Sequence, residues 1–171
     1  MSNEHVITKS AIQNKDKINI YYDNESKTKE IQLNENERYI KSFIDIGLDI
    51  TVVEILDKEK ISIDYFLEPL LDVNTITLIN SNIYRVQYTS ENELNFFIGK
   101  IKEIEKYEFA YLSCLERRCS SGSPIFLEKD IKVLGIHKAY NIEDFQLYGE
   151  FIYPVINLVK NDIKRKRNND K

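Results

Sequence analysis

Short strand-like segments constrain this chain most, because they recur along almost its whole length. In the first half they fall at 17–22, 30–33, 39–44 and 50–55, and in the second half at 82–88, 95–105, 107–113, 123–127 and 132–136. Residues 17–22 and 30–33 alternate between apolar and polar side chains, a period of two that is typical of a strand with one buried face. Residues 56–75 separate the two groups and show little periodicity. The sequence therefore predicts an all-β fold built from two groups of strands.

The end of the chain has a different pattern. From 151 to 163 the apolar residues Ile152, Val155, Ile156 and Val159 follow a helical spacing, which predicts an α-helix with one apolar face. The basic run 164–167 comes directly after it. Such a run is usually a solvated terminus, and a role in nuclear import or in binding an acidic partner is the alternative.

Charge and composition exclude several classes of function. The net charge of −4 argues against nucleic-acid binding by the body of the chain. No apolar run approaches the ~20 residues that span a bilayer, so we expect no membrane partner. Two cysteines, Cys114 and Cys119, do not make a disulfide framework, and whether they pair is left open. With no signal-peptide pattern after Met1, a cytoplasmic location is the default expectation. No metal-ligand cluster or phosphate-binding loop is visible, so we expect no cofactor.

The segment 119–126, Cys-Ser-Ser-Gly-Ser-Pro-Ile-Phe, has the pattern of a serine nucleophile in a tight turn before a strand. Gly122 frees the backbone just after the candidate nucleophile Ser121, and Pro124 fixes φ as the strand begins. Ser120 is the competing nucleophile. An ordinary hairpin loop rich in serine and glycine is the alternative interpretation.

Acyl transfer by serine needs a general base and an acid that orients the base. The chain has two histidines, His5 and His137, so the choice of base is narrow. Asp49 stands just before the apolar segment 50–55 and is the candidate acid, with Asp45 as the alternative.

These segments resemble the motifs of trypsin-like serine proteases. Residues 2–7, Ser-Asn-Glu-His-Val-Ile, are similar to the pattern around the catalytic histidine, and 49–53 are similar to the pattern at the catalytic aspartate. Residues 119–124 resemble the family's Gly-x-Ser-Gly-Gly-Pro signature, with Cys119 and Ser123 in place of two glycines. The resemblance implies a triad of His5, Asp49 and Ser121, in the order of chymotrypsin. It also implies an oxyanion hole formed by the backbone N–H groups of Cys119 and Ser121.

The same resemblance predicts the architecture, a trypsin-like double β-barrel with a C-terminal α-helix. His5 stands four residues after Met1, whereas the family has two strands before its histidine. We therefore expect an N-terminally truncated chain whose first barrel is incomplete and holds His5 loosely. The predicted parts are a partial N-terminal barrel at 1–60, a linker at 61–75, a C-terminal barrel at 76–150, and a helix and basic tail at 151–171.

A further resemblance concerns substrate choice. Glutamyl endopeptidases also carry Gly-Ser-Pro after the serine and Gly-Ile-His on the following strand, as this chain does at 122–124 and 135–137. By that resemblance His137 would bind an acidic side chain before the scissile bond, and Lys138 would add positive charge. Leu115 and Glu116 would form the opposite wall of the pocket.

The sequence thus predicts a serine-type endopeptidase with a peptide or protein substrate. The alternative is a catalytically silent pseudoprotease, or a fragment, that binds peptides or proteins. A third interpretation is a small β-rich interaction domain unrelated to proteases. The oligomeric state is left open.

Overall fold

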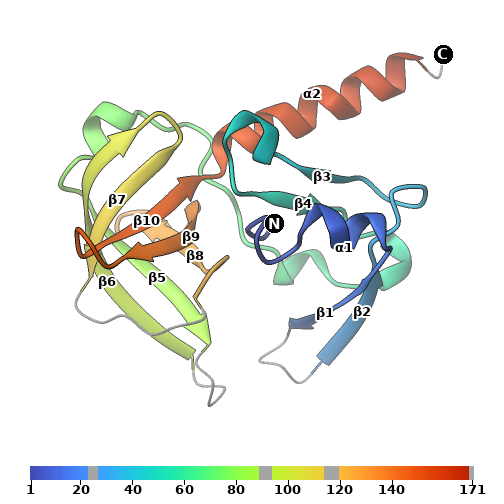
Figure 1. The fold of residues 1–171 in the computed structure, drawn as a ribbon, viewed down its shortest axis with the longest axis horizontal. Helices are drawn as coiled ribbons and strands as arrows, with labels where there is room; N and C mark the ends of the chain where they lie inside the picture. The colour runs from blue at the N-terminus through green and yellow to red at the C-terminus, as the bar shows by residue number, and fades with distance from the viewer. Residues whose placement is uncertain (23–26, 89–93, 114–119, 170–171) are drawn as a thin grey trace. The chain divides into compact units, whose positions relative to one another are not determined.

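The computed structural model describes residues 1–22, 27–88, 94–113 and 120–169. It divides into an N-terminal unit, Met1–Leu67, and a C-terminal unit, Glu68–Lys171 (Figure 1). The fold is mostly β, with a six-stranded barrel and a C-terminal helix, so the predicted fold class is confirmed. The boundary after Leu67 falls within the stretch that was predicted to be a linker.

The N-terminal unit contains one short helix and two antiparallel strand pairs. Its elements are α1 (Lys9–Gln13), β1 (Lys17–Tyr22), β2 (Lys27–Gln32), β3 (Ile40–Ser42) and β4 (Thr51–Val53), with 3-10 turns at Ile44–Ile46, Asp57–Glu59 and Ile63–Tyr65. β1 pairs with β2, and β3 pairs with β4. Thr8 caps α1, because its hydroxyl accepts a hydrogen bond from the Ala11 N–H at 3.1 Å. A small core forms where Ile12, Leu33 and Ile40 meet.

An open apolar cavity of about 1110 Å³ lies within the N-terminal unit. Side chains of β1, of β4 and of the stretch after β4 line most of it, including Ile18, Ile20, Val53, Ile61 and Phe66. The alternation of β1 explains this, since Ile18, Ile20 and Tyr22 share one face of the strand. This face of the N-terminal unit is therefore only partly covered by the chain's own side chains.

A buried ion pair joins Arg38 to Glu59 within the same unit. The two side chains are 3% and 4% exposed, and Arg38 NH2 donates to Glu59 Oε1 at 2.9 Å. Glu59 Oε2 also accepts from the Leu56 N–H, at 2.5 Å. Burial alone would raise the pKa of Glu59, but the hydrogen bonds from Arg38 and Leu56 and the charge of Arg38 lower it below 4.5.

Replacing Arg38 by methionine is expected to destabilise the N-terminal unit by about 3 kcal/mol or more at pH 7, because it leaves a buried carboxylate unpaired. The pKa of Glu59 is depressed in the folded state. Its contribution to wild-type stability is therefore present above pH 4.5 and is lost as the pH falls through the lower folded-state pKa. Urea denaturation of the wild type and the variant, at pH 7 and pH 3, measures both effects.

The control is Lys58→Met, which removes an ion pair whose partners are 59% and 47% exposed. An exposed pair contributes about 1 kcal/mol or less, so this variant should remain close to the wild type. An Arg38→Met protein as stable as Lys58→Met would contradict the assigned role of the buried pair.

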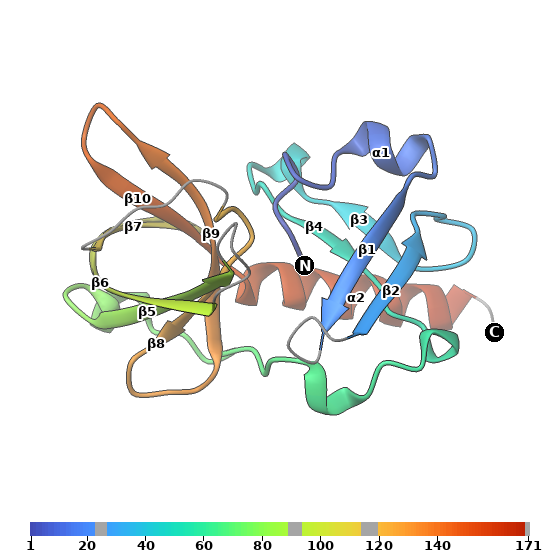
Figure 2. The same cartoon turned by 90° about the horizontal axis from the view of Figure 1, so that it is seen from below.

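The C-terminal unit is built around a closed barrel, which Figure 2 shows end-on. Its strands are β5 (Asn82–Tyr88), β6 (Leu94–Glu105), β7 (Glu108–Ser113), β8 (Pro124–Leu127), β9 (Val133–Asn141) and β10 (Gln146–Phe151), followed by α2 (Tyr153–Asn169). A 3-10 turn at Thr75–Leu78 precedes β5. All neighbouring strands are antiparallel, in the order β10-β7-β6-β5-β8-β9. The apolar core includes Ile83, Phe109, Ile125, Leu134 and Phe151.

Strand β5 brings polar side chains into this interior. Its buried positions are Ile83, Arg85 and Gln87, so one strand contributes an apolar residue followed by two polar ones to the same face. Tyr111 of β7 and His137 of β9 are buried as well. The barrel interior therefore contains polar groups as well as an apolar core.

Candidate active site

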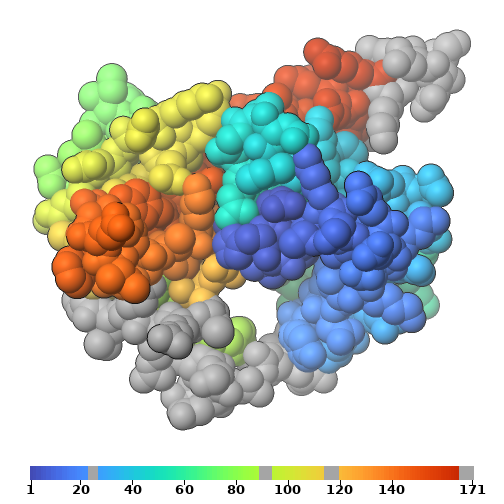
Figure 3. Space-filling model, viewed as in Figure 1, coloured from blue at the N-terminus to red at the C-terminus, as the bar shows by residue number. Residues whose placement is uncertain are grey.

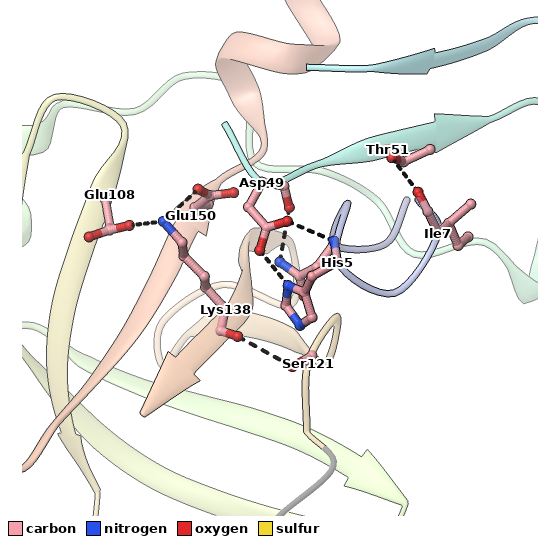
Figure 4. A network of polar contacts seen from close by, with 9 residues as sticks. His5, Ile7, Asp49, Thr51, Glu108, Ser121, Lys138 and Glu150 are labelled. Carbon is pink, nitrogen blue, oxygen red and sulfur yellow. Dashed lines mark hydrogen bonds and ion pairs between the residues drawn. The ribbon is translucent and has the colours of Figure 1, made fainter. Parts of the chain in front are cut away.

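His5 and Asp49 form a hydrogen-bonded pair within the N-terminal unit (Figure 4). The His5 ring nitrogen Nδ1 lies 2.5 Å from Asp49 Oδ2, and the His5 backbone N–H donates to Asp49 Oδ1 at 3.0 Å. The His5 side chain is 48% exposed, whereas that of Asp49 is 11% exposed. One carboxylate thus orients both the main chain and the ring of the histidine and leaves half of the ring accessible.

The residues around His5 are held by the main chain that leads into β4. Ser2 and Thr51 exchange backbone hydrogen bonds at 3.0 and 2.8 Å, and the Glu4 N–H donates to the Asp49 carbonyl at 3.1 Å. In the space-filling view the dark-blue start of the chain lies against the cyan segment that leads into β4 (Figure 3). The expectation that His5 is loosely held is therefore wrong. Backbone hydrogen bonds to residues 49–51 hold the segment in place.

Ser121 lies in a tight turn of the C-terminal unit, immediately before β8. The Ser123 N–H donates to the Ser120 carbonyl at 3.0 Å, which places Ser121 and Gly122 at the two central positions of the turn. Gly122 has φ 83°, the left-handed value that the third position of a type II turn requires. Ser121 Oγ donates to the Lys138 carbonyl at 3.3 Å (Figure 4).

The two adjacent serines have different surroundings. Ser120 is 5% exposed, and its hydroxyl accepts a hydrogen bond from Arg85 inside the barrel, at 3.4 Å. Ser121 is only half-buried. Of the two candidate nucleophiles, Ser121 is thus the more accessible residue.

His137 and Lys138, both on β9, have distinct partners. His137 is 2% exposed, and its Nδ1 lies 2.8 Å from Tyr111 Oη. Lys138 Nζ lies 2.5 Å from Glu108 Oε2 and 3.3 Å from Glu150 Oε1. Burial alone would lower the pKa of Lys138, but the hydrogen bonds and charges of these two carboxylates raise it. The positive charge of Lys138 is therefore already balanced within the protein.

The remaining predicted residues divide into two groups. Cys114, Leu115, Glu116 and Cys119 lie outside the described residues, so the predicted pocket wall and one oxyanion-hole donor stay predictions. Asp45, the alternative acid, is an exposed residue paired with Lys9 at 2.6 Å. His5 and Asp49 are brought together, and Ser121 belongs to the other unit, so the triad stays a prediction.

Sequence reasoning missed Arg85 and Tyr111, which contact the predicted residues Ser120 and His137. Arg85 NH1 donates to Tyr111 Oη at 3.3 Å as well as to Ser120. Arg85 shares one face of β5 with Ile83, but the polar and apolar residues of this strand do not separate by face, so the sequence carried no clear signal for Arg85.

Within the described residues, no group of three or more His, Cys, Asp or Glu side chains is placed to hold a metal ion. Nor does any helix in that part of the chain have the length and apolar character that a bilayer crossing requires.

Comparison with known proteins supports the fold. No family model matches the chain, and no curated protein matches it. Solved structures do match. Deg5 is 13% identical with a TM-score of 0.60, over 91% of this chain and 74% of that one. An inactive mutant of Rv3671c from M. tuberculosis H37Rv is 14% identical with a TM-score of 0.57, over 94% and 74%. Tobacco vein mottling virus protease is 15% identical with a TM-score of 0.52, over 88% and 64%.

These neighbours are trypsin-like proteases, and the chain has their chymotrypsin-like fold. The identities of 13–15% establish the fold alone.

Proposed function

We propose that this protein is a serine-type endopeptidase that hydrolyses peptide or protein substrates. In this proposal Ser121 is the nucleophile, His5 the general base and Asp49 the acid that orients it. The observation that carries the proposal is the His5–Asp49 pair, in which one carboxylate binds both the ring and the backbone N–H of the histidine. A chymotrypsin-like fold gives this pair a context in which such chemistry occurs.

The chemistry follows from the hydrogen-bond directions. With Nδ1–H donating to Asp49, the lone pair of the His5 ring is on Nε2, where it accepts the Ser121 proton as Oγ attacks the scissile carbonyl carbon. The C–N bond then breaks, and the same proton passes from His5 to the leaving amine. Water activated by His5 hydrolyses the acyl-enzyme ester and restores Ser121.

The turn that carries Ser121 supports its assigned role. The left-handed backbone conformation of Gly122 leaves Ser121 at the corner of the turn. Pro124 then directs the chain into β8. The backbone N–H groups of Ser121 and Cys119 would stabilise the oxyanion. We propose no cofactor, since the reaction needs none.

A fluorophosphonate probe, which reacts with activated serines, tests the proposal. The wild-type protein is expected to become covalently labelled, and peptide mapping should locate the adduct on Ser121 rather than on Ser120. Labelling should disappear in Ser121→Ala. The matched control is Ser113→Ala, which removes a hydroxyl bonded to the Ile98 carbonyl at the end of β7 and should label normally.

Circular dichroism on each sample confirms that the chain is folded. A folded protein that stays unlabelled would overturn the proposal and favour the catalytically silent, peptide-binding pseudoprotease. Labelling that persists in Ser121→Ala would assign the reaction to another serine.

A further inference from the structure

Arg85 is a cation buried inside the barrel of the C-terminal unit. It lies on β5, one of the six strands that close the barrel (Figure 2), and it is 1% exposed. Its Nη1 donates two long hydrogen bonds to hydroxyl groups, to Tyr111 Oη at 3.3 Å and to Ser120 Oγ at 3.4 Å. Among the residues that the structure describes, its Nε and Nη2 have no hydrogen-bond partner. The charge is therefore buried while part of its donors stay unused.

The surroundings of Arg85 do not balance its charge. Within the described part of the chain, its hydrogen-bond acceptors are two hydroxyls and no carboxylate. Two carboxylates of the same barrel, Glu108 and Glu150, are paired with Lys138 instead. The Phe97 ring lies 5.0 Å from the guanidinium carbon. A cation–π contact of this kind offsets only part of the cost of taking a charge out of water.

An arginine at such a position has few ways to lower this cost. A buried lysine can lose its proton and become neutral, because burial lowers the pKa of an amine. A guanidinium stays protonated in proteins, so Arg85 keeps its charge in the barrel interior. A counter-ion is the remaining means of compensation. The burial of an arginine rather than a lysine thus points to an anion beside it.

The unused donors of Arg85 have the arrangement that an oxyanion requires. The N–H of Nε and one N–H of Nη2 are parallel neighbours on one side of the planar guanidinium, and this side can bind two oxygens of one anion at once. Gln87 follows two residues later on the same interior face of β5 and is 5% exposed. Its amide nitrogen also lacks a partner among the described residues. Arg85 and Gln87 together offer three unused N–H donor groups to one ligand.

We propose that Arg85 and Gln87 form a binding site for a small free oxyanion, of the size of formate or bicarbonate, in the barrel interior. Nε and Nη2 of Arg85 bind two oxygens of the anion, and the Gln87 amide donates to one of them. Both residues are almost completely buried, so the site suits a ligand of a few atoms. The anion neutralises a structural charge and takes no part in the proposed hydrolysis, so this inference does not depend on the proposed function.

Nuclear magnetic resonance of isotope-labelled formate tests the proposal on the wild-type protein. In a buffer whose other anion is chloride, the formate signal should broaden or shift as protein is added, and the effect should saturate at one formate per chain. Formate should also raise the unfolding temperature of the C-terminal unit, because a ligand that binds only the folded state stabilises it. Added chloride at the same ionic strength is the control for screening. A formate signal that the protein leaves unchanged would overturn the proposal and leave water as the partner of Arg85.

Variants then assign the binding to the two residues. Arg85→Met replaces the guanidinium by an apolar side chain and should abolish binding. Arg85→Lys keeps a charge but loses the paired donors, and its dissociation constant should rise about tenfold. The matched control is Lys132→Met, which removes an exposed cation of the same unit that is paired with Glu68 at 3.0 Å, and it should bind formate as the wild type does. Binding that persists in Arg85→Met would overturn the proposal.

Gln87→Leu keeps the test valid if Arg85→Met does not fold. This variant retains the guanidinium and removes one hydrogen-bond donor, so its dissociation constant for formate should rise about fivefold. Circular dichroism confirms that each sample is folded. An affinity equal to that of the wild type would overturn the site formed by both residues.

Discussion

An Asp49→Asn variant is expected to lose about four powers of ten in kcat, with little change in fold. Asp49 binds His5 through two oxygens, one facing Nδ1 and one accepting the backbone N–H. Asparagine keeps one oxygen but presents an NH₂ group in place of the other. Where that NH₂ group faces Nδ1, it forces the ring proton onto Nε2, and His5 can no longer accept the proton of Ser121. The lost factor corresponds to about 5 kcal/mol of transition-state stabilisation.

Hydrolysis of a fluorogenic peptide, or the rate of fluorophosphonate labelling, measures the effect. Asp45→Asn is the matched control, because Asp45 is a nearby aspartate whose side chain is 76% exposed and paired with Lys9. Its rate should stay within a factor of two or so of the wild type, since an exposed ion pair contributes little. A rate for Asp49→Asn within tenfold of the wild type would show that Asp49 is not the orienting acid.

A Gly135→Ala substitution is expected to destabilise the C-terminal unit by about 4 kcal/mol or more. Gly135 lies on β9, where an added Cβ would be 2.4 Å from the backbone oxygen of Glu150 on β10 and 2.9 Å from the Phe109 ring. A backbone oxygen within a closed barrel cannot move aside without breaking the ladder between β9 and β10. The loss is comparable to the whole stability of many domains.

Hydrogen–deuterium exchange read by mass spectrometry suits this test, because it reports on each unit separately. Protection should fall throughout β5 to β10 and persist in the N-terminal unit. Gly47→Ala is the control, since the new Cβ there meets no atom within 4 Å and adds only the strain of φ 83°. Unchanged protection of β9 in Gly135→Ala would refute the argument from close packing.

Local patterns predicted the strands well because strand formation depends on the residue types within a few consecutive positions. β5 occupies 82–88 as predicted, and β8 begins at Pro124, one residue into the predicted strand. The turn around Ser121 was also predictable, since Gly122 and Pro124 restrict the backbone wherever they occur. α2 begins at Tyr153 and runs to Asn169, beyond the apolar spacing that predicted it.

What the sequence could not predict depends on packing between distant segments. The apolar and polar residues of β5 do not separate by face, so nothing local indicates that Arg85 is buried while Tyr84 is only half-buried. Likewise, the hold on His5 comes from residues 49–51, and that pairing has no local signature. The truncation of the chain, the glutamyl-endopeptidase resemblance and the pocket wall at Leu115 and Glu116 remain predictions.

The long sequence separation between His5 and Asp49 has a consequence for synthesis and folding of the chain. The hydrogen bonds from Asn3 and His5 to Asp49 span 46 and 44 residues of sequence. Contacts of such separation form only after a long loop has closed, and they form late in folding. A ribosome releases His5 well before Asp49, so a nascent chain carries the imidazole without the carboxylate that orients it. The pair can thus form only after Asp49 has left the ribosome, so the base is unoriented in the shortest nascent chains and becomes oriented before Ser121 is synthesised.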